Sequence, residues 1–399
     1  MRGFWSELEV RYGKLQATGR PLRPLAIRLP NGSERVFGGS APPVCVVDLK
    51  SEAAFEAFAS MDELTIGEAY MAGDISATGD ILELFKLRDI MTDRRPLQYV
   101  WTNHVRPRLF GQVKGDVEFI GSHYDEPPEF FELWLDKDIR SYSHGFFERD
   151  DEALEVGMKR KFQYAIDAIG AKPGDRVLDI GGGWGSFVQY AGEQGIHVHS
   201  VTISDESEAY IRKVIANRGL SNCRVDKVHL LEFSARPFDG IVNLGVTEHL
   251  PDYKRTIAKY CELLAPGGRI YLDAYSGDKF GMSTFVMKWV FQSNTSPLCL
   301  PDYLKEVERS SLELLQVQSD RHNYFLSCKK WAENLDAHRE EISARWGEFL
   351  WRRFHLYLWS SAFAFQDGIL GAHRLVMEQS KDSHGRAMRN PNGQRRRLV

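Results

Sequence analysis

The chain contains few cysteines, and their spacing pairs none of them. Five cysteines stand among 399 residues, at Cys45, Cys223, Cys261, Cys299 and Cys328, and no two form a CxxC motif. An odd and scattered set argues against a disulfide framework and against a zinc site, and it is typical of a reducing compartment. We therefore expect no metal centre.

Long hydrophobic runs are also missing. No stretch approaches the roughly 20 consecutive apolar residues of a membrane-spanning helix. The N-terminal segment MRGFWSELEVRYGKL is charged where a signal peptide has an apolar run. Both absences lead us to expect a cytoplasmic protein.

Charge of one sign is not in excess. Lysine and arginine number 51 against 55 aspartates and glutamates, which gives a net charge of -4. No basic helix with interleaved aromatic residues is present, so we expect no nucleic-acid partner. The last segment, residues 381–399, is basic and without periodicity. We expect it to be a flexible tail that is solvated or weakly attracted to anionic lipid head groups.

The remaining composition and the local patterns predict two domains. Hydrophobic residues make up 43% of the chain and charged residues 27%, as in ordinary globular proteins. Alternating apolar residues and an Asn-Gly turn predict a small β-containing unit over residues 25–49, and Ser51 is a candidate N-cap for the next helix. Because residues 103–122 lack a clean period, we place a linker there. The predicted domains are residues 1–110 and 111–380.

The pattern from Val177 onward alternates strands with helices. VLDI, VHSVTI, FDGIVNLG and RIYLDAY are predicted strands. Between them, SFVQYAGEQG is a predicted helix ending at a C-cap glycine, ESEAYIRKVIANRG is a second, and YKRTIAKYCELLAPGG runs into a Pro-Gly-Gly stop. This alternation predicts an α/β fold with a parallel, doubly wound sheet.

A glycine-rich turn follows the first of these strands. Asp179 precedes Gly181, Gly183 and Gly185, and Trp184 stands within the turn. Open α/β sheets bind ligands at the carboxyl ends of their strands, and glycine lets the backbone approach a ligand closely. No GK[ST] phosphate motif follows. An acid before the turn suits a cationic ligand such as a sulfonium, which predicts S-adenosylmethionine, although a dinucleotide site or a structural turn would share the pattern.

Several segments together resemble the cyclopropane fatty acid synthase and mycolic acid cyclopropane synthase family of S-adenosylmethionine-dependent methyltransferases. They cover most of the chain: GEAYMAG at residues 67–73, HYD at 123–125, YSHGFFE at 142–148, VLDIGGGWGSF, VTISDESEAY, VTEHLPDYKRT, HNYFLSCKKW and WRRFHLYLWSSAFAFQDGIL. Any one of these segments would be weak evidence, and the set is specific.

The resemblance implies a fold and an activity. The fold is a Rossmann-like, seven-stranded methyltransferase domain with a smaller α+β N-terminal domain for lipid docking or dimerisation. The activity is methyl transfer from S-adenosylmethionine to the cis double bond of an unsaturated fatty acyl chain, often in a phospholipid. The implied cofactor-binding residues are Tyr142, Ser143, Asp179, Gly181, Gly183, Trp184, Gly185, Thr202, Ile203 and Ser207. The implied partners are a membrane surface, contacted peripherally at its inner face, a second copy of the chain, and a separate reductase.

The resemblance also implies a base site, from which this sequence departs. Methyl transfer leaves a carbocation on the acyl chain, and in the family a bicarbonate held by Cys, Glu, His and Tyr removes the proton. Glu248 and Tyr324 occupy the Glu and Tyr positions, but His144 stands at the Cys position and Asp273 at the His position. Tyr275 replaces an apolar neighbour.

The cofactor side departs from the family in two further positions. Ser207 stands where the family has Gln, and Gly182 replaces the Cys of its glycine turn.

The altered base site changes the expected chemistry. A site with Glu248 and Asp273 is more negative than the family's and holds bicarbonate less readily. His144 could offset that charge when protonated, or act as the base when neutral. We therefore predict that protein groups remove the proton, and that the product is a cyclopropane or a methylene- or methyl-branched chain.

Simpler interpretations of these residues stay open. His144 could hydrogen-bond a backbone carbonyl, Asp273 could cap a helix, Tyr324 and Trp184 could be core aromatics, and the aromatic-rich segment FLWRRFHLYLWSSAFAF predicts a buried helix that could also wall an acyl tunnel. Two other functions share the pattern, namely a methyltransferase for a small molecule and a non-catalytic protein that binds acyl lipid or S-adenosylmethionine.

Overall fold

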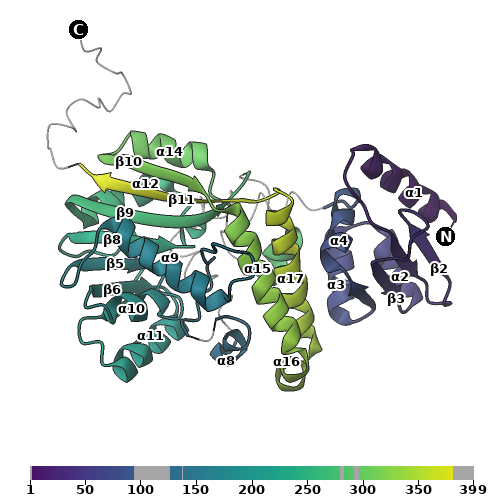
Figure 1. The fold of residues 1–399 in the computed structure, drawn as a ribbon, viewed down its shortest axis with the longest axis horizontal. Coiled ribbons are helices and arrows are strands. Elements are labelled where there is room, and N and C mark those ends of the chain that lie inside the picture. The colour runs from purple at the N-terminus through teal and green to yellow at the C-terminus, as the bar shows by residue number, and fades with distance from the viewer. Residues whose placement is uncertain (1, 94–125, 137, 279–282, 292–295, 381–399) are drawn as a thin grey trace, which may run out of the picture.

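The computed structural model describes residues 2–93, 126–136, 138–278, 283–291 and 296–380. Figure 1 shows an N-terminal unit at one end, a seven-stranded sheet at the other, and a layer of long helices between them. The predicted boundary at residue 110, the linker at 103–122, the HYD segment at 123–125 and the tail at 381–399 lie outside the described residues.

The N-terminal unit is a small α+β structure. Its sheet has the strand order β2-β1-β3-β4. Its elements are α1 (Arg2–Ala17), β1 (Leu25–Arg28), β2 (Glu34–Phe37), β3 (Cys45–Leu49), α2 (Glu52–Ala59), α3 (Glu63–Ala72), β4 (Ile75–Gly79), α4 (Ile81–Phe85) and the 3-10 helix η1 (Lys86–Ile90). The strands predicted over residues 25–49 are present, and the Ser51 side chain caps α2 by accepting from the Ala54 N–H at 3.0 Å.

The larger unit contains the seven-stranded sheet, with the order β10-β11-β9-β8-β5-β6-β7. Its elements up to the central strand β8 are α8 (Pro128–Glu132), α9 (Leu154–Ile169), β5 (Arg176–Ile180), α10 (Ser186–Gly192), β6 (His197–Thr202), α11 (Asp205–Arg218), β7 (Arg224–Lys227) and β8 (Phe238–Leu244). The elements after β8 are the 3-10 helix η3 (Thr247–His249), α12 (Tyr253–Leu263), β9 (Leu264–Ser276), α13 (Thr284–Trp289), α14 (Leu300–Glu308), β10 (Leu312–Ser319), α15 (Arg321–Ala337), α16 (Arg339–Trp346), α17 (Glu348–Gln366) and β11 (Gly371–Gln379).

The observed sheet confirms the Rossmann-like, seven-stranded prediction and corrects its details. The sheet is mixed rather than parallel, because β11 runs antiparallel to both β9 and β10. Helix α10 ends at Gly192, before the positive-φ Gly195 where the sequence predicted its end. Strand β9 begins at Leu264, ahead of the Pro-Gly-Gly segment, with an irregular register opposite Phe238 and Gly240.

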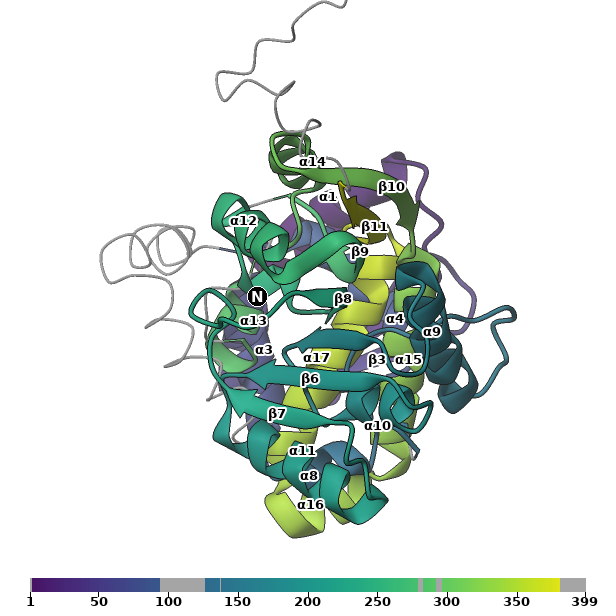
Figure 2. The same ribbon diagram turned by 90° about the vertical axis from the view of Figure 1, so that its left-hand side faces the viewer.

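Both faces of the sheet are covered by helices. Ile241 and Leu272 belong to one apolar core with residues of α12 and α14, and their neighbours Val242 and Tyr271 belong to another with residues of α9, α10 and α11. Adjacent strand residues point to opposite faces, so these continuous apolar strands are buried on both sides. Figure 2 shows α12 on one side of the strands and α9 on the other.

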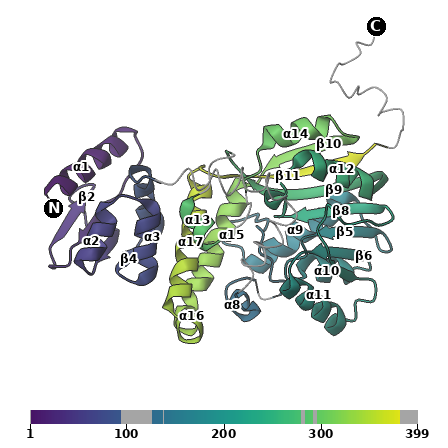
Figure 3. The ribbon, with the colours of Figure 1, turned by 180° about the vertical axis from the view of Figure 1, so that it is seen from behind.

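Helices α15, α16 and α17 join the sheet to the N-terminal unit. Figures 1 and 3 both place α17 between the sheet and helices α3 and α4. The buried Arg352 of α17 donates from Nη1 to the carbonyl oxygens of Tyr70 and Ile75, each at 3.2 Å. Of the helices that the structure describes, none combines the length and the apolar character needed to cross a bilayer.

Candidate functional site

Two cavities meet at the carboxyl ends of the central strands. The smaller, of about 90 Å³, lies behind the glycine turn that follows β5. The larger, of about 260 Å³, extends from the ends of β8 and β9 past α15 and α17 to the N-terminal unit. Gly245 and His249 line both cavities. The two cavities are therefore neighbours at this junction, with Gly245 and His249 in the wall of both.

The glycine turn forms one wall of the smaller cavity. Gly181 has a φ of +95°, and a Cβ there would overlap Cγ2 of Val246. Gly183 has a φ of +51°, and a Cβ there would meet no atom within 4 Å. Since Gly183 lines the cavity, that Cβ would stand in the space a ligand needs. The turn therefore fits a ligand that approaches the backbone closely.

The segment after β6 forms the opposite wall. Thr202, Ile203, Ser204 and Ser207 line the cavity. Ser204 caps α11 by accepting from the Ser207 N–H at 3.1 Å, and the Ser207 hydroxyl donates to the carbonyl of Gly183 at 2.6 Å. This bond fixes the two walls relative to one another, because it joins the β6–α11 turn to the β5–α10 turn.

Other residues predicted to bind the cofactor lie outside this cavity. The Asp179 carboxylate accepts from the Ser200 hydroxyl at 2.7 Å, and burial raises the pKa of Asp179 to about 6. Trp184 packs between Phe131 and Tyr210, with ring centroids 5.4 and 5.3 Å away. These two side chains support the glycine turn and do not line the smaller cavity.

Three more residues that were predicted to bind the cofactor also lie outside the lining of the smaller cavity. Gly185 is the N-cap residue of α10, and a Cβ there would lie 3.4 Å from Cγ1 of Ile211. Ser143 lies beside Gly245, whose Cβ would be 3.4 Å from that of Ser143. Tyr142 lines the larger cavity instead.

The loop after β7 completes the smaller cavity, and the sequence analysis missed it. Val228, His229 and Leu230 line the space together with Leu250. A usable signal existed, because β7 is parallel to β6 and its carboxyl end must reach the same edge of the sheet. The segment RVDK is short and polar, however, and does not read as a strand.

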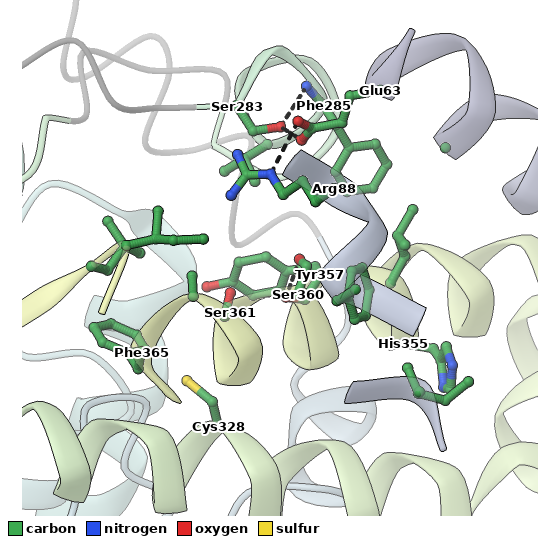
Figure 4. Close-up of a pocket in the computed structure, with 18 of the residues that line it drawn as sticks. Glu63, Arg88, Ser283, Phe285, Cys328, His355, Tyr357, Ser360, Ser361 and Phe365 are labelled. Atoms are coloured by element: carbon green, nitrogen blue, oxygen red, sulfur yellow. Dashed lines mark hydrogen bonds and ion pairs between the residues drawn. The ribbon is translucent and has the colours of Figure 1, made fainter. Parts of the chain in front are cut away.

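The larger cavity is predominantly apolar. The larger unit contributes these residues to its lining: Tyr142, Tyr275, Tyr324, Cys328, Trp331, Tyr357, Ala364 and Phe365. Figure 4 shows Tyr357, Ser360, Ser361 and Phe365 along α17, with Cys328 of α15 beneath them. The aromatic-rich helix is therefore both buried in the core and part of the cavity wall.

Glu248 lies at the end of this cavity nearest the junction. Its side chain is 2% exposed, and Oε1 accepts from the Tyr275 N–H at 2.8 Å. Oε2 has no hydrogen-bond partner among the described residues. Burial, with a smaller contribution from the charge of Asp273, raises the pKa of Glu248 to about 8. Because this pKa is close to neutral pH, the Glu248 carboxyl suits proton transfer.

Tyr324 lines the cavity and is held between two rings. Its ring stacks on His144 with centroids 4.6 Å apart and on Phe365 with centroids 4.2 Å apart. Burial holds the pKa of Tyr324 well above its usual value, with Glu248 adding to the effect. The hydroxyl therefore stays protonated and can act as a hydrogen-bond donor.

His144 and Asp273 are not part of the cavity lining. His144 is fully buried behind Tyr324, and its Nε2 lies 3.6 Å from Oδ2 of Asp320, beyond hydrogen-bonding distance. Asp273 is fully buried as well, and its Oδ2 accepts from the Tyr271 hydroxyl at 3.3 Å. The structure thus brings Glu248, Tyr275 and Tyr324 to the cavity and places His144 and Asp273 one layer behind it.

A buried lysine that the sequence did not single out lies near Asp273, outside the lining of the larger cavity. Lys161 of α9 is fully buried and donates to the hydroxyls of Ser143 at 2.5 Å and Ser141 at 3.1 Å. Burial lowers the pKa of Lys161 to about 8, while Asp273 and Asp136 favour its charged form. Sequence gave no signal for it, since one lysine in an amphipathic helix is usually exposed.

His249 is another residue that the sequence did not single out. It follows Glu248 directly and faces both cavities. Burial lowers the pKa of His249 to about 4, so the imidazole is neutral at physiological pH. A neutral ring at the junction would add no charge beside a cationic ligand.

Comparisons with known proteins identify the family. A family model described as mycolic acid cyclopropane synthetase matches residues 112–375, and one described as a domain of unknown function matches residues 20–90. A probable fatty acid methyltransferase of Pseudomonas putida is 27% identical over 385 residues, covering 90% of this chain and 93% of that protein. Cyclopropane mycolic acid synthase 2 of Mycobacterium bovis is 28% identical over 282 residues, covering 64% of this chain and 92% of that protein.

Solved structures agree with this assignment and confirm the predicted fold. The cyclopropane synthase MmaA2 of Mycobacterium tuberculosis superimposes with a TM-score of 0.62 at 26% identity, covering 66% of this chain and 98% of that one. Mycolic acid cyclopropane synthase CmaA1, complexed with SAH and CTAB, gives a TM-score of 0.62 at 25% identity, with 66% and 98% covered. The chain therefore belongs to the mycolic acid cyclopropane synthetase family and is an S-adenosylmethionine-dependent methyltransferase.

Proposed function

We propose that this enzyme transfers a methyl group to a carbon of the cis double bond in an unsaturated fatty acyl chain carried by a phospholipid. The observation that carries the proposal is the junction at Gly245 and His249, two residues that line both a cavity beside the glycine turn and a larger apolar cavity. An apolar cavity of this kind favours hydrocarbon over polar small molecules, because polar groups buried without partners lose their hydration.

The residues of the smaller cavity fit the cofactor. Gly181 and Gly183 leave room for close approach of a ligand to the backbone, and Thr202, Ser204 and Ser207 provide polar groups around it. When bound, S-adenosylmethionine supplies an electrophilic methyl group. An alkene is a weak nucleophile, so the chain's own task is to align the double bond at the junction and to exclude water from it.

We assign proton removal to Glu248. The new carbon–carbon bond uses the alkene's π electrons and leaves a carbocation on the acyl chain, which must lose one proton. Oε2 of Glu248 lacks a hydrogen-bond partner among the described residues and belongs to a side chain that lines the cavity. Loss of the proton from the new methyl group, with closure of a third carbon–carbon bond, gives a cyclopropane, and loss after a hydride shift gives a methylene branch. Reduction of a methylene branch to a methyl branch would need a separate reductase.

This assignment makes bicarbonate dispensable. Two carboxyl groups, on Glu248 and Asp273, stand where the family resemblance implies one carboxyl and one histidine, and both are buried. His144 lies behind Tyr324 and outside the cavity lining. An assay in buffer stripped of carbon dioxide should retain the wild-type rate, and strict dependence on added bicarbonate would contradict the assignment.

The relatives support a lipid substrate. One carries the name probable fatty acid methyltransferase, and others are named cyclopropane mycolic acid synthases. An acyl chain within a phospholipid would require peripheral contact with a membrane, which we place at the inner face of the cytoplasmic membrane. A homodimer formed through the N-terminal unit also remains part of the proposal.

Lipid analysis of an expressing host tests the function. The protein is produced in a bacterium that makes no modified fatty acids, the cells are fed oleate, and the acyl chains of each lipid class are identified by mass spectrometry. We expect a new acyl species heavier than oleate by one methylene unit for a cyclopropane or methylene branch, found in phospholipids and absent with Glu248→Gln. Unchanged acyl chains in cells that contain folded, cofactor-binding protein would refute the proposal.

A further inference from the structure

The larger cavity continues beyond the larger unit, which contains the seven-stranded sheet, and into the N-terminal unit. Strands β3 and β4 and helices α3 and α4 contribute lining side chains, among them Val47, Ile66, Ala77, Ile81, Leu84 and Phe85. These residues lie far from the glycine turn in sequence, and the seven-stranded sheet alone would leave this side of the cavity open. The wall is therefore a product of the way the two units pack together.

Most of this wall is apolar and suits hydrocarbon. The polar side chains on the N-terminal side of the lining are Glu63, Arg88 and Tyr70. Glu63 and Arg88 form an ion pair at 3.2 Å, and the Ser283 hydroxyl of the neighbouring segment donates to Glu63. Figure 4 shows these three side chains together on one side of the cavity. Away from this cluster and Tyr70, the N-terminal surface offered to a ligand is aliphatic and aromatic.

The N-terminal unit is held firmly enough to act as a fixed wall. Asp93 accepts from the N–H of Thr284 at 2.9 Å and from its hydroxyl at 2.8 Å. Glu68 accepts from Lys288 at 2.6 Å and from the Trp289 indole at 3.1 Å. Together with Arg352 on α17, these bonds connect the N-terminal unit to both segments that flank the cavity.

We infer that the N-terminal unit holds the methyl-terminal part of the substrate's acyl chain and thereby selects its length. The inference rests on the proposed function, since it assumes an acyl chain with its double bond near Glu248. The hydrocarbon beyond the double bond then lies against Ile66, Ala77 and Ile81. A chain too long for this space meets the wall, and a shorter chain leaves apolar surface uncovered.

Ala77 offers the sharpest test of this wall. It is paired with Val47 across β3 and β4, and both side chains line the cavity. The next residue, Thr78, is exposed and points to the opposite face of the strand. Ala77→Leu therefore adds bulk inside the cavity, and Thr78→Leu adds bulk to the same strand outside it. Ile66→Ala is the reverse change, because it removes bulk from the wall.

The experiment measures binding and turnover with the same substrates. Full-length wild type and the three variants are titrated with cis-monounsaturated fatty acids of fourteen, sixteen, eighteen and twenty carbons, followed by tryptophan fluorescence. Product ratios are then measured with mixed phospholipids of the same chains. Affinity for S-adenosylhomocysteine and the circular dichroism spectrum serve as controls for folding, since the smaller cavity is unchanged.

We expect Ala77→Leu to lower affinity for the eighteen-carbon chain relative to the fourteen-carbon chain by about tenfold, the usual scale for one misfit apolar group in a pocket. Ile66→Ala should move the preference toward longer chains, and Thr78→Leu should match wild type. A length preference of Ala77→Leu identical to that of Thr78→Leu would overturn the inference, as would a wild type that binds none of these chains. Binding with the expected preference but without product would refute the proposed function and leave the acyl wall standing.

Discussion

The two cavities are built in different ways. The smaller cavity, to which we assign the cofactor and which we call the cofactor cavity, is lined by residues between Ile180 and Leu250 at one edge of one sheet. Glycine backbone forms part of its wall. The larger cavity, to which we assign the acyl chain and which we call the acyl cavity, is lined by residues between Val47 and Leu370. Large side chains on helices of both units form much of its wall. If these assignments hold, cofactor binding depends on side chains being absent from one wall, whereas substrate choice depends on which side chains are present in the other.

The largest effect should come from Glu248, the group to which we assign proton removal. Glu248→Gln keeps an oxygen to accept from the Tyr275 N–H but cannot accept a proton. We expect kcat to fall by about a hundredfold to ten-thousandfold, the range for loss of a general base, with affinity for S-adenosylhomocysteine unchanged. Rates are measured by product mass spectrometry.

A matched control is Glu262→Gln on α12, whose side chain is 55% exposed. This variant should keep the wild-type rate. Equal rates for Glu248→Gln and the control would remove Glu248 from the mechanism.

The next largest effect should be a pH dependence of activity that cofactor affinity does not share. Only the ionised Glu248 carboxylate can accept a proton, and its pKa is raised to about 8, so activity should rise with pH through that value. Simple titration predicts an increase of about fiftyfold between pH 6 and pH 8. Cofactor affinity should not follow this rise. A flat pH–rate profile in wild type, or the same rise in Glu248→Gln, would show that another group controls the reaction.

A single added methyl group in the cofactor cavity should weaken cofactor binding. Gly183→Ala places a Cβ in the ligand space, and we expect affinity for S-adenosylhomocysteine to fall by about tenfold to a hundredfold, as for overpacking of a tight site. Gly219→Ala is the matched control, because Gly219 also has a positive φ and open space around its Cβ position but lies outside the cavity.

Both glycine variants should lose about 1 kcal/mol of stability through the left-handed backbone, as measured by thermal unfolding. Isothermal titration separates them, because only Gly183→Ala should bind the cofactor more weakly. Equal affinities would mean that the glycine turn is structural.

The smallest effect should come from the layer behind the acyl cavity. His144→Phe keeps a ring stacked on Tyr324 and removes both imidazole nitrogens. If His144 only positions Tyr324, activity should stay within about tenfold of wild type, and His144→Ala should lose more because the support is gone. A loss with His144→Phe as large as that with Glu248→Gln would make His144 the base instead.

Local patterns predicted the parts of the molecule that local interactions determine. The strands around the glycine turn, the Ser51 cap and the end of α11 at the left-handed Gly219 depend on residues close in sequence. The placement of β11 between β9 and β10 does not, because strand pairing at this distance is decided by the whole sheet. Alternation alone therefore led to a parallel sheet.

The candidate site divides in the same way. Gly181, Gly183 and Ser207 were identified from a motif, and all three line the cofactor cavity. The motif could not show that Asp179 would turn toward Ser200, or that His144 would be stacked behind Tyr324. Side-chain direction depends on neighbours brought in from other elements, and so does the contribution of the N-terminal unit to the acyl cavity.

A crystal structure with S-adenosylhomocysteine and a monounsaturated acyl lipid bound together tests the central claim most directly. The account predicts that the cofactor's sulfur faces the double bond across the junction at Gly245 and His249, with the methyl end of the chain against Ala77. An acyl chain bound elsewhere on the protein, with the junction filled by side chains or water, would contradict it.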